Sequence, residues 1–427
     1  MSLFLFFLIL LTLGVPIAIA MGVVPFVYVI FSDICPNCLL GYKMYDSVDS
    51  FTLIAVPLFM LGGNLVSVVG MTQKIINFAD QIVGRIRGGL SHVNVLVSTI
   101  LGGLNGSAVA DVAAVGAILI KPMKKNGMKG SYAAAVTSVG GAIAAIIPPS
   151  IPFIIYATSV GDISIGALFV GGILPGICIC CLMIVTGYII SVKRGVPKSE
   201  GKFEIKKFFK ASIEASPALI LVAIVIIGLR GGMFTPTEAG SIIVFYSLFV
   251  GIIIYKNLTL KILTNVLKET AVMTGVVFLV ISAAGPFMWV LTRIGSINSL
   301  TDFFINLTTN PVLWWIGVFI FLLVAGMIMD TVANLIILSP IVYEAAKSMG
   351  FDPFVSSLVI AILMILGTVT PPVGVSLFVS SAIAEESIED TGKEAIPFVC
   401  CVLFVLVIML LFPNFTKFVP RLFGYQL

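Results

Sequence analysis

The chain has 427 residues, of which 59% are hydrophobic and only 10% are charged, and its mean hydropathy is +1.18. A soluble domain could not expose so much apolar surface to water, so the composition predicts a polytopic membrane protein with roughly 10 to 12 membrane-crossing elements. The net charge of +4 is too small to indicate nucleic-acid binding, and the single histidine excludes a histidine-based metal site.

The first apolar stretch, residues 1–31, is interpreted as a membrane span and not as a cleaved signal peptide. No Lys or Arg precedes it, and it is about twice as long as the apolar region of a signal peptide. The following loop carries Cys35 and Cys38 in a CxxC pattern, which fits an incidental pair, a small disulfide or a thiol-exchange site. No thioredoxin-like pattern surrounds the pair, which favours the first two interpretations.

Loop charges predict the topology. The segments 71–90, 121–130 and 193–210 are rich in Lys and Arg, so all three are expected on the cytoplasmic side. The apolar run 91–120 lies between the first two of these loops and is therefore predicted to be a re-entrant hairpin that turns at its glycines. The run 312–339 lies between loops poor in basic residues and is predicted to be a second hairpin, entering from outside.

The remaining apolar segments are predicted to cross the membrane. Residues 71–90 are instead expected to form an amphipathic helix on the membrane surface. The predicted crossings after the first span are 51–70, 131–156, 167–190, 216–229, 239–255, 270–291, 354–383 and 395–413.

Two Pro-Pro pairs, at 148–149 and 371–372, reveal an internal repeat with a spacing of 223 residues. Gly127 and Gly350 have the same spacing, as do Asp162 and Glu385. Further matches at spacings of 219, 225 and 229 are Asp111 with Asp330, Gly70 with Gly295 and Pro57 with Pro286. Three crossings separate the two units, so the second unit should be inverted in the membrane.

The repeat divides the chain into four expected regions. Residues 1–50 form an N-terminal scaffold span with an outer loop, and 191–269 form a basic cytoplasmic loop with scaffold spans. Residues 51–190 and 270–427 are the two repeats, each with a span, a surface helix, a hairpin, a broken helix and a final span. The fold class is therefore an all-α membrane protein with an inverted repeat, two re-entrant hairpins and two Pro-Pro-broken helices.

The broken helices and hairpin tips supply the candidate site. Pro-Pro removes two backbone donors in mid-membrane, and the freed carbonyls, neighbouring hydroxyls and half-helix ends are suited to binding sodium and a substrate carboxylate. The candidates at the breaks are Pro148, Pro149, Ser150, Thr368, Thr370, Pro371, Pro372 and Gly374. The candidates at the tips are Gly103, Asn105, Gly106, Ser107, Asp111, Gly326, Asp330, Thr331 and Asn334.

Structural alternatives exist for these residues. The proline pairs could be packing kinks, and Asp111 and Asp330 could equally be helix N-caps or, as acids at membrane depth, functional residues. The sequence contains no GxxxxGK[ST] motif, which excludes a P-loop ATPase. A passive channel is the main functional alternative, and a serine hydrolase built on Ser107 and His92 is a remote one.

Four segments resemble the large membrane subunit of tripartite ATP-independent periplasmic (TRAP) transporters. They are 105–111 (NGSAVAD), 147–151 (IPPSI), 231–239 (GGMFTPTEA) and 370–374 (TPPVG), and the likeness extends over essentially the whole chain. The resemblance implies a sodium-coupled secondary uptake system of the bacterial inner membrane, working as an elevator of the ion-transporter-superfamily type and not as an enzyme. It also implies a periplasmic substrate-binding protein and a small four-helix membrane subunit as partners.

The resemblance implies an organic acid as substrate, with co-transported sodium ions and no organic cofactor. Overall likeness favours the sialic acid branch over C4-dicarboxylates. However, no arginine stands in a hairpin or Pro-Pro turn to hold a carboxylate. The small subunit is expected as a separate chain, because no four extra helices precede the first span.

Overall fold

The computed structural model describes residues 2–32, 38–198, 204–230, 233–372 and 374–425, and within these ranges the chain contains helices and no strands. Seven of the described helices are long and apolar enough to cross a membrane, and a bent pair raises the number to eight. The all-α membrane class is therefore confirmed.

The N-terminal apolar stretch is not one continuous span. It forms α1 (Ser2–Thr12) and α2 (Ile17–Ser32), separated by a turn in which Gly14 has a φ of 79° and Pro16 precedes the second helix. A positive φ and a proline both oppose a continuous helix, which corrects the prediction. A short helix, α3 (Cys38–Asp46), follows. Cys35 lies outside the described residues, so the structure does not test the predicted CxxC pair.

The predicted elements of the first repeat are present. The predicted hairpin is α6 and α7, and it turns at Gly106 and Ser107, just beyond the glycines 102 and 103. The predicted broken helix is α8 and α9, bent by 51° around Pro148 and Pro149. The elements are η1 (Phe51–Ile54), α4 (Ala55–Val68), α5 (Met71–Val83), α6 (Gly89–Asn105), α7 (Ala108–Lys125), α8 (Gly130–Ile146), α9 (Ile151–Val160) and α10 (Ile165–Lys193).

Between the repeats lie α11 (Ile205–Arg230), α12 (Pro236–Phe249) and η2 (Val250–Ile254). The FTPTE segment explains the start of α12. Thr235 is the N-cap, Pro236 occupies the first turn, and Glu238 accepts a hydrogen bond of 2.7 Å from the Thr235 N–H while its own N–H donates to the Thr235 hydroxyl. This reciprocal capping box gives these residue types a structural role.

The second repeat has the same order of elements as the first. Its hairpin is α15 and α16, and its broken helix is α17, η3 and α18. A terminal amphipathic helix, α20, was not predicted; it packs on α10 and α19. The elements are α13 (Leu260–Arg293), α14 (Ser296–Ile305), α15 (Pro311–Ile328), α16 (Thr331–Ser348), α17 (Pro353–Leu366), η3 (Gly367–Val369), α18 (Val375–Ala384), α19 (Ile388–Leu411) and α20 (Pro413–Leu422).

The turns of the two repeats match in backbone conformation. Gly70 and Gly295 each precede the short helix after the first span, with φ of 88° and 72°. Gly127 and Gly350 each follow a hairpin, both with a φ of 79°. Both Pro-Pro peptide bonds are cis. Glycines with a positive φ thus recur at matched places in the two halves. Since this backbone conformation is costly for other residues, the recurrence supports the repeat independently of the matches in sequence.

The two repeats interlock. The returning arm of each hairpin packs on the distal half of the other repeat's broken helix, α7 on α18 and α16 on α9. At the end of α7, Lys124 lies 3.7 Å from the Glu386 carboxylate, and at the end of α16, Lys347 lies 2.9 Å from Asp162. The hydrogen bond and charge of Asp162 raise the pKa of the Lys347 ammonium. The spatial counterpart of Asp162 is thus Glu386, next to the predicted Glu385.

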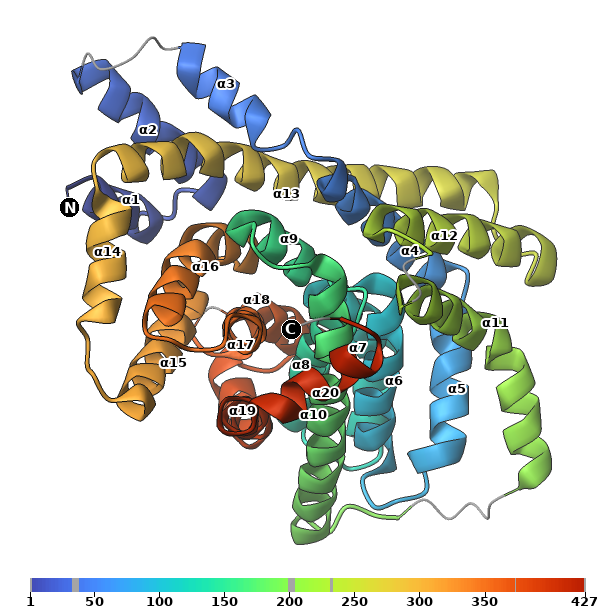
Figure 1. The fold of residues 1–427 in the computed structure, drawn as a ribbon. Coiled ribbons are helices and arrows are strands. Elements are labelled where there is room, and N and C mark those ends of the chain that lie inside the picture. The colour runs from blue at the N-terminus through green and yellow to red at the C-terminus, as the bar shows by residue number, and fades with distance from the viewer. Residues whose placement is uncertain (1, 33–37, 199–203, 231–232, 373, 426–427) are drawn as a thin grey trace.

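A second group of helices lies along one side of the interlocked repeats. The long helix α13 contacts α2, α3 and α4, and α4 packs closely on α12. Figure 1 shows α13 running along one edge of the molecule, with α2 and α3 near one end and α4 and α12 near the other. The hairpins and broken helices lie beneath it in the same view.

Candidate functional site

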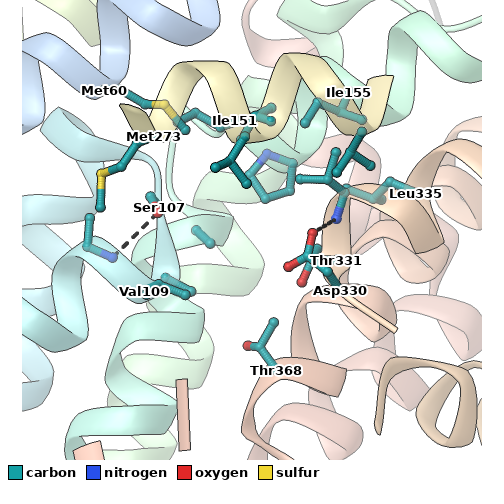
Figure 2. Close-up of a pocket in the computed structure, with 18 of the residues that line it drawn as sticks. Met60, Ser107, Val109, Ile151, Ile155, Met273, Asp330, Thr331, Leu335 and Thr368 are labelled. Atoms are coloured by element: carbon teal, nitrogen blue, oxygen red, sulfur yellow. Dashed lines mark hydrogen bonds between the residues drawn. The ribbon is translucent and has the colours of Figure 1, made fainter. Parts of the chain in front are cut away.

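The candidate site is a cavity of about 430 Å³ between α13 and the two hairpin tips. Five predicted residues line it, namely Asn105, Ser107, Asp330, Thr331 and Thr368. Figure 2 shows Ser107 of the first tip and Asp330 and Thr331 of the second on opposite sides, with Thr368 below. The structure therefore brings both tips and both broken helices to a single space, although they are far apart in sequence.

The other predicted residues are not among the described residues that line this cavity. They are Gly103, Gly106, Asp111, Pro148, Pro149, Ser150, Gly326, Asn334, Thr370, Pro371, Pro372 and Gly374.

The first hairpin tip is docked on the first Pro-Pro break. The Ile151 N–H donates a hydrogen bond of 3.2 Å to the Gly106 carbonyl. A Cβ at Gly106 would lie 2.3 Å from the Pro149 carbonyl oxygen, and Gly106 has a φ of 57°. Both facts require glycine at this position. The Pro149 and Pro148 carbonyl oxygens thus face the hairpin arm at Gly106 and Gly103.

Similar close packing joins each hairpin to its own broken helix. A Cβ at Gly102 would lie 2.7 Å from the Cα of Ala144, and one at Gly326 would lie 2.6 Å from the Cα of Gly367. The two contacts are related by the repeat spacing. Small residues allow the backbones to meet, so each tip is held in register with the break behind it.

The hydroxyls at the breaks are engaged with nearby backbone groups. Ser150 is the N-cap of α9: its hydroxyl donates to the Ala145 carbonyl and accepts from the Phe153 N–H at 3.3 Å. Thr368 donates to the Ile365 carbonyl at 2.8 Å, and Thr370 donates to the Gly367 carbonyl at 2.9 Å. These side chains close the broken helix ends, while their oxygen lone pairs stay available as acceptors.

The second tip is built around two polar residues. Asp330 is the N-cap of α16 and accepts a hydrogen bond of 3.0 Å from the Val332 N–H, which confirms the N-cap interpretation for this residue. Asn334 donates to the carbonyls of Ala325 and Met329 at 3.3 and 3.2 Å. Asn334 therefore joins the two arms of the hairpin behind the turn.

Asp111 differs from Asp330. The N-cap of α7 is Ser107, whose hydroxyl accepts from the Ala110 N–H, so the N-cap interpretation is wrong for Asp111. Its side chain is completely buried, with Ser98 and Asn105 beside it. Ser98 and Asn105 lie close enough to interact with the carboxyl group, but within the described stretches of the chain no hydrogen bond of ordinary geometry reaches the two carboxyl oxygens, the Ser98 hydroxyl or the Asn105 amide oxygen. This is a compact group of uncompensated oxygens just behind the tip.

The cavity contains helix N-termini but no cationic side chain among its described lining residues. α7 contributes its first turn, and α9 and α16 also begin at the wall. The N–H groups of Ala108 and Val109 have no acceptor within α7, because they belong to its first turn. An anion in this cavity would therefore meet the first N–H groups of α7, whereas the Ile151 and Phe153 N–H groups of α9 already donate to Gly106 and Ser150, and the Val332 N–H of α16 donates to Asp330.

The hydrolase alternative is excluded by geometry. His92 lies in the first turns of α6 and its Nε2 atom is 2.9 Å from the Arg87 carbonyl oxygen. Ser107 follows the other end of the same helix, about 20 Å away along the axis. The two side chains cannot form a dyad.

Some lining residues were not predicted. Asn64 of α4 reaches the cavity and donates a hydrogen bond of 3.0 Å to the Thr270 hydroxyl of α13. Met60 and Met273 line the same side (Figure 2). Asn64 could have been predicted as a candidate because it is a polar residue within the apolar segment 51–70. Ser98, beside Asp111, is likewise a polar residue in the apolar first arm of the hairpin.

The comparison with known families decides the assignment. The profile of the family described as "Tripartite ATP-independent periplasmic transporter, DctM component" matches residues 4–415. The chain belongs to this family. It is a large permease of the TRAP type, a multi-pass inner-membrane protein of a secondary transport system and not an enzyme.

Several relatives carry names with different substrates. The chain is 34% identical to the sialic acid TRAP transporter large permease protein SiaM of Vibrio cholerae, over 96% of each chain. It is 33% identical to the 2,3-diketo-L-gulonate TRAP transporter large permease protein YiaN of Escherichia coli, over 94% of each chain. It is 32% identical to the C4-dicarboxylate TRAP transporter large permease protein DctM of Pseudomonas aeruginosa, over 90% of each. These identities are too similar to select a substrate.

Proposed function

We propose that the chain is the large subunit of a sodium-coupled transporter that takes up an organic acid and binds it in the cavity between the two hairpin tips. The observation that carries this proposal is the meeting of three helix N-termini in one cavity without Lys, Arg or His among the described lining residues. The relatives are named for sialic acid, diketogulonate and C4-dicarboxylates, all of which are anions. Of these, sialic acid remains our preferred substrate.

Anion binding without a cationic side chain has a physical basis. The first N–H groups of a helix lack internal acceptors, and the helix dipole adds partial positive charge there. In the first turn of α7, the N–H groups of Ala108 and Val109 would donate to a carboxylate, and the Ser107 hydroxyl lies beside them. The negative charge of Asp330 on the opposite wall would repel an anion that binds without a cation. A sodium ion near Asp330 would remove that repulsion, which links sodium binding to substrate binding.

The second proposed sodium site is the buried oxygen group of Asp111, Ser98 and Asn105. A buried carboxylate without partners costs several kcal/mol, and a small cation with oxygen ligands is the natural compensation. Asn105 lines the cavity and also lies beside Asp111, so it connects this site to the substrate space. Carbonyls and hydroxyls at the two Pro-Pro breaks complete the proposed set of sodium ligands.

The mechanism we propose is an elevator movement. The interlocked hairpins and broken helices, within 51–190 and 270–427, would carry the site past a scaffold that includes the N-terminal residues 1–50 and the residues 191–269. The recurrence of elements and the loop charges support an inverted repeat, which is the usual basis of alternating access. A small four-helix membrane subunit and a periplasmic binding protein are the proposed partners, as family membership suggests.

The test is uptake by the reconstituted complex. Proteoliposomes with the small subunit and the cognate binding protein would be given a panel of labelled acids, namely sialic acid, diketogulonate and C4-dicarboxylates. We expect one acid to be exchanged in counterflow, and only when the binding protein is present. Currents without any acid would instead support a passive channel. Failure of every acid, with the folded complex verified, would contradict the proposed substrate class.

A further inference from the structure

Three cavities follow one another along α13. The central cavity borders α13 between Val272 and Val280. A second cavity, of about 380 Å³, lies toward Met288 and Asp46 and shares Ile155 with the central one. A third, of about 300 Å³, lies toward Glu269 and Thr72. The loop charges place the third cavity on the cytoplasmic side, so the series follows the expected direction of transport.

The central and third cavities meet at one close contact. Gly63 of α4 and Asn105 of the first hairpin tip line both cavities. A Cβ at Gly63 would lie 2.6 Å from the Asn105 Cβ and 2.9 Å from its Cα. The backbones of α4 and the tip therefore touch here, and only glycine permits the approach. Asn64 and Met273 border the same narrowing.

The two sides of this contact are held differently. On the scaffold side, α4 is packed on α12 at Gly62, whose added Cβ would lie 2.5 Å from the Ile243 side chain, and Asn64 is hydrogen-bonded to Thr270 of α13. On the other side, Asn105 ends α6 and is followed by the left-handed Gly106. The contact of α4 with α12 is more extensive than its contact with the hairpin arm α6. Separation at this point would thus move the tip and leave α4 in place.

We propose that the contact between Gly63 and Asn105 is an inner gate, which closes the central cavity from the third cavity and opens when the hairpin tip leaves α4. This gate rests on the proposed transport function and adds the route by which the acid leaves. Gly63 acts as a positioning residue, because its missing side chain allows the closed state to form. Any side chain at position 63 favours the open state, since only the closed state contains the close approach.

The test compares Gly63→Ala with Gly62→Ala. The two added methyl groups meet neighbouring atoms at nearly equal distances, but only the methyl at position 63 meets the hairpin tip. The reporter is Val277→Cys, which lines the central cavity and not the third. It is labelled with an impermeant thiol reagent in inside-out vesicles, and the labelling of protein without the reporter is subtracted. No transported acid is needed for this measurement.

We expect Gly63→Ala to raise the labelling rate of the reporter about tenfold or more. A tenfold change corresponds to a shift of about 1.4 kcal/mol in the free-energy difference between the closed and open states of the gate. Gly62→Ala should label like the parent protein, even if thermal unfolding shows the two variants to be equally destabilised. Equal labelling of the two variants would overturn the gate. Since labelling is independent of uptake, a complex that transports no acid would contradict the proposed function and leave this comparison intact.

A second variant covers the case in which Gly63→Ala does not fold. Cysteines introduced together as Gly63→Cys and Asn105→Cys need only about 1 Å of extra separation to form a disulfide. Oxidation should then hold the gate closed and suppress labelling of the Val277→Cys reporter in inside-out vesicles, and reduction should restore that labelling, whereas oxidation of the protein with the reporter alone should have no such effect. Unchanged reporter labelling in the cross-linked protein would also overturn the proposal.

Discussion

Replacing Asp111 by asparagine is expected to remove the stabilisation of the protein by sodium while leaving the fold intact. Asparagine has nearly the same shape as aspartate but carries no charge. The Asp111 side chain is fully buried, and among the described residues only the neutral Ser98 and Asn105 side chains lie beside it, without a hydrogen bond of ordinary geometry to either carboxyl oxygen, so in the wild type a bound sodium ion would supply the missing compensation of charge. At a sodium concentration of 100 times the dissociation constant, this binding stabilises the wild type by about 2.7 kcal/mol.

The assay is thermal unfolding of the purified protein in sodium chloride and in choline chloride of equal ionic strength. The wild type should unfold a few degrees higher in sodium, and Asp111→Asn should unfold at the same temperature in both salts. In choline the variant should be at least as stable as the wild type, because it buries no carboxyl group. Asp302→Asn, which changes an exposed acid of α14, is the matched control and should keep the sodium effect. An undiminished sodium shift in Asp111→Asn would refute this reasoning.

Three further predictions follow from the breaks and the topology. Ser150→Ala and Thr370→Ala should each weaken the apparent sodium affinity of uptake several-fold, since a lost hydroxyl ligand costs on the order of 1 kcal/mol. Each should also lower thermal stability slightly, because the hydroxyl closes a helix end. Wild-type sodium affinity in both variants would mean that these residues have only structural roles. Pro148→Ala should lower uptake more strongly than either, because a restored helix withdraws the carbonyls that face the hairpin; normal uptake would argue against a functional break. Cysteines at Lys125 and Lys347 should be labelled by impermeant reagents from opposite sides of the membrane, the first from the cytoplasm; labelling from one side would disprove the inverted repeat.

The sequence was sufficient to predict the main elements because their signals are strong and local. The lengths of the apolar segments located the spans, the charges of the flanking loops indicated the two hairpins, and the proline pairs located the broken helices. The exceptions have local causes as well. Gly14 and Pro16 divide the first apolar stretch, which a length criterion does not detect. The helix α20 is amphipathic and mixed in composition, so it gave no span signal.

The packing of the two repeats could not be predicted in the same way. Nothing local in a single sequence indicates that α7 packs on α18 or that α16 packs on α9. That interlocking helps to decide which candidates face the cavity: Ser107 and Thr368 line it, whereas Ser150 and Thr370 do not. Asn64 was missed for a related reason, since a lone polar residue in a span does not reveal the neighbour that it faces.

The central claim is that a sodium gradient drives accumulation of an organic acid through this chain and its two partners. Its most direct test is uptake of the labelled acid by proteoliposomes that contain the complete complex and no ATP. With an inward sodium gradient, the acid should accumulate above its external concentration and should leave again when the gradient is collapsed. Accumulation that is unchanged after the collapse of the gradient would contradict the account.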